Sequence, residues 1–145
     1  MSWRNETPPT VQEDLDLLAD EALSAATHLL GEQRGELYPF GVRLPADGKP
    51  ELVGADRGEG EHPAPEALLD LLYESMSAMR DGARAVAFVA HVETPEGDAV
   101  RVELEHRDGG PALVLLLPYR RRRLRRALET GDLVATPGER RVWTS

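Results

Sequence analysis

The sequence predicts an α+β fold: a five-stranded antiparallel sheet with helices on both faces, in the chain order α-β-β-α-β-β-β-α. Two stretches of the 145-residue chain carry apolar side chains at helical spacing. Five shorter runs have the Val, Leu and Phe content of strands, and turn residues separate the last three at hairpin spacing. A chain of this length suits one domain with one core, residues 1–145.

The first helix is expected from Thr10 to about Leu30, after a flexible leader at residues 1–9. Thr10 and Glu13 stand in the positions of a capping box, in which each side chain bonds the other residue's backbone. An apolar stripe follows at spacings of three and four residues and needs a surface to pack on. Its members are Val11, Leu15, Leu18, Ala22, Ala25 and Leu29.

A hairpin is expected next, with strands at residues 37–44 and 51–55. Tyr38, Phe40 and Val42 share one face at the two-residue period of a strand. The glycine at position 41 suggests a bulge or a close backbone approach.

The second helix begins near Pro65, which suits a first turn, and ends with Gly82 as its C-cap. One face carries apolar side chains at helical spacing. These are Leu68, Leu72, Met76 and Met79.

Three strands in a row follow, at residues 85–94, 100–107 and 112–118. The middle strand alternates, so that its apolar residues point one way and Glu103 and Glu105 the other, into solvent. The third strand is apolar on both faces and needs cover on both.

The register of the first two of these strands is predicted from their apolar residues. If Val86, Phe88 and Val92 share a face with the apolar residues of the middle strand, the numbers of paired residues sum to an even value. That register places Thr94 opposite Val100, Glu93 opposite Arg101 and His91 opposite Glu103, with opposite charges facing each other.

The chain is expected to close with a short arginine-rich helix at Tyr119–Glu129 and a final segment that docks on the fold. Its expected docking points are Leu133, Val134, Val142 and Trp143. Residues 119–145 carry a balance of +5, whereas residues 1–118 carry −14 within a net charge of −9. The basic end therefore has an acidic body of its own to lie against.

The order of the elements looks like that of roadblock/longin and profilin-like domains, folds that mostly act as interaction platforms. The phrases Tyr38-Pro39-Phe40-Gly41 and Leu117-Pro118-Tyr119-Arg120 resemble phrases in small uncharacterised proteins of GC-rich bacteria. That resemblance brings no assigned activity or functional residues.

The strongest local feature is an arginine cluster, with two interpretations. As a nucleic-acid site it would neutralise phosphates, which gives affinity without reading sequence. Alternatively its members pair with acids of the protein's own surface or of a partner subunit, which the acidic body favours. The cluster comprises Arg120, Arg121, Arg122, Arg123, Arg125 and Arg126.

Four aromatic residues are candidates for partner binding, because Tyr and Trp often anchor interfaces. They are Tyr38, Phe40, Tyr119 and Trp143. In a chain with only 5% aromatic residues, the competing interpretation is that they fill the core.

No catalytic, cofactor-binding or metal-binding residue is predicted. His91 and His106 lie on neighbouring strands but are expected on different faces, and His62 sits in an acidic loop expected to be solvated. The sequence has no H-x-x-x-H spacing and no G-x-S-x-G motif.

The sequence therefore favours a non-enzymatic protein–protein interaction module whose partner is another protein or a second copy in a homodimer. The alternative is a nucleic-acid-binding protein that uses the arginine cluster. An enzyme would need a pocket lined by His91 or by the hairpin at residues 38–40, and no cofactor is expected. The first residues lack a signal peptide's apolar region, residues 112–117 are too short to cross a membrane, and cysteine is absent. A cytoplasmic location without membrane association is expected.

Overall fold

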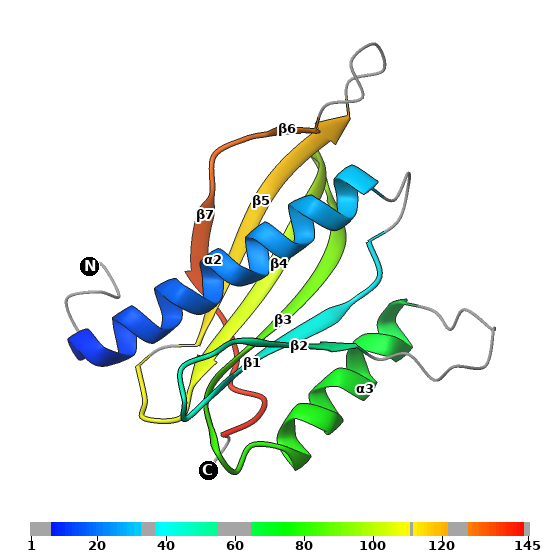
Figure 1. Cartoon of the computed structure of the whole chain (residues 1–145). Coiled ribbons are helices and arrows are strands. Elements are labelled where there is room, and N and C mark those ends of the chain that lie inside the picture. The colour runs from blue at the N-terminus through cyan, green and yellow to red at the C-terminus, as the bar shows by residue number, and fades with distance from the viewer. Residues whose placement is uncertain (1–6, 33–36, 55–64, 111, 122–127, 144–145) are drawn as a thin grey trace.

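The computed structural model describes residues 7–32, 37–54, 65–110, 112–121 and 128–143. The described residues form an α+β fold with an antiparallel sheet, as predicted, but with two helices and seven strands rather than three and five (Figure 1). The strand order is β2-β1-β3-β4-β5-β6, and β7 also pairs with β5. The elements are α2 (Pro9–Glu32), β1 (Phe40–Pro45), β2 (Glu51–Gly54), α3 (Pro65–Ala78), β3 (Ala83–Thr94), β4 (Gly97–His106), β5 (Leu113–Arg121), β6 (Leu128–Thr130) and β7 (Val134–Pro137).

Helix α2 crosses one face of the sheet and forms the larger core with alternate residues of β1, β3, β4 and β5 (Figure 1). The predicted stripe is buried as far as Ala22, and Ala26 and Leu30 then replace Ala25 and Leu29, which are only partly buried. The stripe shifts because a straight helix has 3.6 residues per turn, not 3.5.

The start of α2 differs from the prediction. The helix begins at Pro9, so Thr10 lies inside the first turn and the capping box is wrong. The backbone N–H of Gln12 donates instead to the carbonyl of Pro8 at 3.0 Å. Because proline lacks an N–H and its φ suits a first turn, Pro9 can begin the helix one residue earlier.

Helix α3 packs on the opposite face, where Leu72 and Met76 meet Val86 and Phe88 of β3. The predicted close approach at Gly41 is confirmed, because a Cβ built there would lie 2.6 Å from the Met76 Cε. The predicted C-cap is wrong: α3 ends at Ala78, and Gly82 (φ 83°) serves the turn into β3.

The three-stranded meander is present as β3, β4 and β5, but the predicted register of its first hairpin is wrong. Thr94 pairs with Gly97, so a two-residue turn joins the strands and paired numbers sum to an odd value. Glu93 therefore pairs with Asp98, whereas Arg101 pairs with Ala90, and Glu93 and Arg101 point to opposite faces.

The prediction failed because β3 is buried on both faces. Every residue from Ala85 to Ala90 is buried, with Ala85, Ala87 and Val89 toward α2 and their neighbours toward α3. A strand that is apolar on both sides fits either parity, so the tight turn sets the register, with Gly97 at φ 125°.

The predicted arginine-rich helix is also wrong where it can be compared. Tyr119, Arg120 and Arg121 continue β5, and β6 returns antiparallel beside them. Next to β6, β7 pairs with the first half of β5. Arginine is a good helix former, but helix propensity is a weak preference, and strand pairing along the sheet edge overrides it.

Candidate functional site

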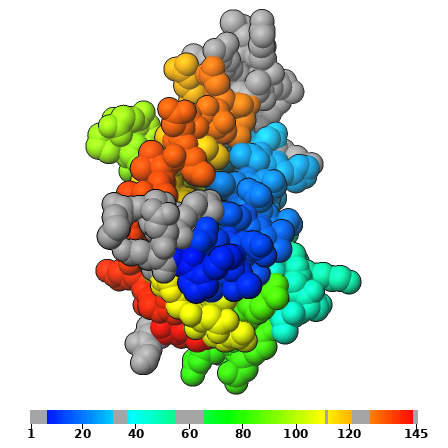
Figure 2. All heavy atoms as spheres, turned by 90° about the vertical axis from the view of Figure 1, so that its left-hand side faces the viewer, coloured from blue at the N-terminus to red at the C-terminus, as the bar shows by residue number. Residues whose placement is uncertain are grey.

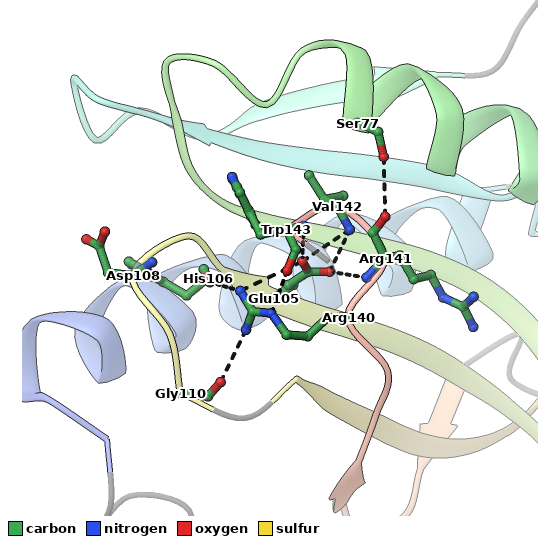
Figure 3. Close-up of polar contacts among 9 residues, drawn as sticks. All are labelled: Ser77, Glu105, His106, Asp108, Gly110, Arg140, Arg141, Val142 and Trp143. Atoms are coloured by element: carbon green, nitrogen blue, oxygen red, sulfur yellow. Dashed lines mark hydrogen bonds and ion pairs between the residues drawn. The ribbon is translucent and has the colours of Figure 1, made fainter. Parts of the chain in front are cut away.

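Two carboxylates of β4 point to the α3 side of the sheet. Glu103 and Glu105 are 6% and 3% exposed. The prediction that they face solvent is wrong, because residues Arg140–Trp143, here called the clasp, contact both carboxylates. Figure 3 shows the contact with Glu105.

Three consecutive backbone N–H groups of the clasp hold the Glu105 carboxylate (Figure 3). Arg141 donates to Oε1 at 2.6 Å, Trp143 donates to Oε2 at 2.6 Å, and Val142 lies 3.1 Å from both oxygens. Successive N–H groups turned toward one anion form a nest. A hydrogen bond to a charged group contributes about 1.5–3 kcal/mol, so this contact is strong enough to position the clasp.

The Arg141 side chain reaches the second carboxylate. Its Nε donates to Glu103 Oε1 at 2.6 Å, and its guanidinium lies 4.3 Å from the centroid of the Tyr73 ring. The Tyr73 hydroxyl donates to Glu103 Oε2, and Arg101 pairs with the same oxygen at 3.2 Å. Glu103 is therefore neutralised from both sides, and a cation–π contact adds to the arginine's position.

Two pKa values follow from this arrangement. Burial, and then the hydrogen bond to Glu103, raises the pKa of Tyr73 to about 12. Burial alone would lower the pKa of Arg141, but the hydrogen bond and charge of Glu103 outweigh it and raise that pKa. At neutral pH Tyr73 is therefore a neutral phenol donor and Arg141 a guanidinium cation.

The other clasp residues anchor it on both sides. Val142 is 4% exposed and joins the core cluster of Leu72, Met76 and Phe88. The prediction that Val142 docks on the fold is therefore confirmed. Arg140 donates to the carbonyls of His106 at 2.8 Å and Gly110 at 3.3 Å (Figure 3). The clasp is thus bound by backbone, charge and apolar contacts together.

A second surface lies at the sheet edge formed by β7. All four residues of this strand are exposed, and Leu133 and Val134 are each 48% exposed. Figure 2 shows the orange atoms of this region on the outside of the molecule, beside the blue atoms of α2. A cleft of about 380 Å³ between α2 and β7 is lined by Leu15, Ala19, Leu23, Leu133 and Ala135, among others. Residues 133–137 and this cleft are here called the β7 surface.

The four aromatic candidates for partner binding differ in how far they are buried. Phe40 and Tyr119 are buried in the core under α2, so their burial supports the core interpretation. Tyr38 is 37% exposed just before β1, and Trp143 is partly buried in the clasp. Their role in partner binding stays a prediction.

Little of the arginine cluster falls within the described residues. Arg120 pairs with Glu129 at 2.8 Å across β5 and β6. The backbone of Arg121 lies in β5. Arg122, Arg123, Arg125 and Arg126 lie outside the described residues, as does the acidic loop around His62.

His91 and His106 both point to the α2 face, which corrects the prediction of different faces. His91 pairs with Asp98 at 2.8 Å and contacts the Tyr119 ring edge-on, whereas His106 bonds Asp14 of α2 at 2.8 Å. An open cleft of about 450 Å³ adjoins the first pair and is lined by Asp98, Tyr119 and other residues. No group of three or more His, Asp or Glu side chains in the described part could hold a metal ion.

Sequence reasoning missed the clasp residues Arg140 and Arg141 and their partner Tyr73. One signal was available: the basic balance of the last 27 residues against the acidic body predicted that the end of the chain would lie on the fold. The arginines that do so in the structure lie outside the arginine cluster.

Comparisons with protein-family models, curated proteins and solved structures found no match. Among the described helices, none is both long and apolar enough to span a membrane.

Proposed function

We propose that this protein is a non-enzymatic protein–protein interaction module, and that a second copy of the chain docks on the β7 surface. The observation that carries the proposal is the exposed, apolar edge strand. An edge strand offers a row of backbone N–H and C=O groups to which a partner strand can add.

The side chains of the β7 surface suit such a partner. Leu133 and Val134 are neighbours in sequence and project to opposite faces, because Leu133 lines the α2 cleft and Val134 pairs with Leu116 on the other side. A two-fold arrangement would pair β7 with β7 of the second copy and continue the sheet. Pro137, which cannot donate to a ladder, lies at the strand's end, where it interferes least.

Light scattering on purified protein tests this proposal. One chain has a mass of 16.0 kDa, so the dimer is expected at about 32 kDa, twice that value. The double variant Leu133→Glu/Val134→Glu should run as a monomer, because it places charge in the apolar contact. Leu52→Glu is the matched control, since Leu52 is 61% exposed on the opposite edge strand β2. A monomeric wild type at micromolar concentration, or a dimer that persists in the double variant, contradicts the proposal.

The enzyme and nucleic-acid alternatives gain no specific support. His91, His106 and Glu103 each pair with groups of the protein itself. Arg120 is the member of the arginine cluster whose side chain the structure describes, and it pairs with Glu129. These contacts favour the self-paired interpretation for Arg120.

A further inference from the structure

We infer that the groove between α3 and β4 is a peptide-binding site, and that the clasp is its intramolecular ligand. The occupant in trans would be an extended segment of a partner protein with the clasp's chemistry: an arginine, a small aliphatic residue and an aromatic residue in succession. This site is separate from the β7 surface and does not depend on the proposed dimer.

The groove presents three features that a linear ligand can satisfy together. The Glu105 carboxylate faces into it, and its hydrogen bonds in the described part of the chain all come from the clasp backbone. The Glu103 carboxylate and the Tyr73 ring form a receptor for one guanidinium. Leu72, Met76, Val86 and Phe88 form an apolar slot that receives one aliphatic side chain.

In such a ligand, the backbone would supply affinity and the side chains would supply specificity. The three N–H groups that reach Glu105 carry no sequence information, so any segment that adopts this nest can supply them. The guanidinium receptor selects arginine, because its side chain both donates to Glu103 and stacks on Tyr73. The slot selects a side chain near the size of valine.

The clasp leaves room for a better ligand. Trp143 is only partly buried. Arg140 donates its hydrogen bonds to the carbonyls of His106 and Gly110, so its ion pair with Glu105 Oε2 is long, at 4.0 Å, and includes no hydrogen bond. A second copy's clasp cannot compete well, because the chain's own clasp has a local concentration in the millimolar range. The occupant is therefore assigned to a different protein whose segment binds more tightly than the clasp.

A labelled peptide of residues 139–145 probes the site by fluorescence anisotropy. The background is the full chain with Leu133→Glu/Val134→Glu, which removes the proposed dimer contact, so failure at the groove and failure at the β7 surface give different results. In that background, a clasp-weakened variant, Arg141→Ser/Val142→Ser, should bind the peptide saturably. The chain with an intact clasp should bind about tenfold more weakly or worse, because its site is already occupied.

A peptide with the Arg141→Glu change should not bind the clasp-weakened variant. A folded variant without saturable binding, or equal binding with and without an intact clasp, would overturn the inference. Folding is checked by a cooperative thermal melt.

Should the clasp-weakened variant not fold, the chain with the natural clasp decides. Unlabelled peptide is added to isotope-labelled protein up to concentrations above the millimolar local concentration of the clasp, and the amide signals of Arg141, Val142 and Trp143 are followed by NMR. Displacement moves all three signals toward unfolded-chain positions. Unmoved signals at the highest peptide concentration refute the site.

Discussion

At the residue scale, the clearest result is that a buried carboxylate on β4 organises the end of the described chain. Glu105 is 3% exposed and accepts hydrogen bonds from three successive amides. A buried charge is tolerated only when it is hydrogen-bonded or paired. Alternation in β4 placed Glu103 and Glu105 on one face, but a local pattern cannot distinguish solvent from a segment 36 residues further along the chain, and so their burial was not predictable.

Replacement of Glu105 by glutamine tests this role. The side chain keeps its shape but loses its charge, and its amide NH₂ group must face a backbone donor. We expect the free energy of unfolding to fall by about 2–3 kcal/mol. Urea denaturation measures the change.

Glu51→Gln is the matched control, because Glu51 forms an ion pair with Arg43 while its side chain is 58% exposed. That substitution should cost less than about 1 kcal/mol. Equal losses in the two variants would show that the Glu105 contact does not position the clasp.

Tyr73 gives the site a signature at high pH. Burial and the hydrogen bond to Glu103 raise its pKa from 10.0 to about 12. The unfolded chain therefore loses this proton first, so the stabilisation is complete below pH 10 and declines as the pH rises from about 10 to 12.

Phenolate absorbance during an alkaline titration measures this shift. We expect a late tyrosine ionisation in the native protein that disappears in Tyr73→Phe. An unchanged titration curve in that variant would be inconsistent with the Tyr73–Glu103 contact.

At the scale of elements, the sequence pattern was informative where one face of an element is apolar and failed where both are. The α2 stripe and the apolar face of α3 were predicted correctly from Val11 to Ala22 and from Leu68 to Met76. The register of β3 was not, because Val86 and Phe88 meet α3 while their equally apolar neighbours meet α2. The pairing of β6 and β7 with β5 was missed because short edge strands carry little periodicity.

The close contact between α3 and β1 requires a residue without a side chain at position 41, which is glycine. Gly41→Val should lower the free energy of unfolding by about 1–3 kcal/mol. The new Cβ would lie 2.6 Å from Met76 Cε and 3.4 Å from the Ala87 carbonyl oxygen, and the flexible Met76 side chain is fully buried, so it can move aside only by disturbing its neighbours. Thermal or chemical denaturation checks the loss.

Gly31→Ala is the control for this prediction. Apart from its chain neighbours and its own helix backbone, no atom of the described residues lies within 4 Å of a Cβ at Gly31, which is in the last turn of α2, so alanine should be neutral or stabilising. Gly41→Val as stable as the wild type would mean that α3 packs less closely on β1 than the structure shows.

At the scale of the whole molecule, the two faces of the sheet are covered in different ways. Helix α2 covers one face, whereas α3 and the clasp share the other. Among the described strands β7 pairs only with β5, which leaves its outer edge open there (Figure 1). The predicted charge division between an acidic body and a basic end agrees with the contacts of Arg140 and Arg141, although the sequence could not identify which arginines dock. The proposed docking of a second copy rests on the exposed strand β7, which the sequence did not predict, and composition could not identify a partner.

Hydrogen–deuterium exchange at β7, followed as a function of protein concentration, tests the proposed docking most directly. If a second copy adds to this edge, the backbone amides of residues 134–136 that do not bond to β5 exchange more slowly at high concentration and faster on dilution, while β2 amides stay unchanged. Equal exchange of the β7 amides at all concentrations, in a protein that remains folded, would contradict the account.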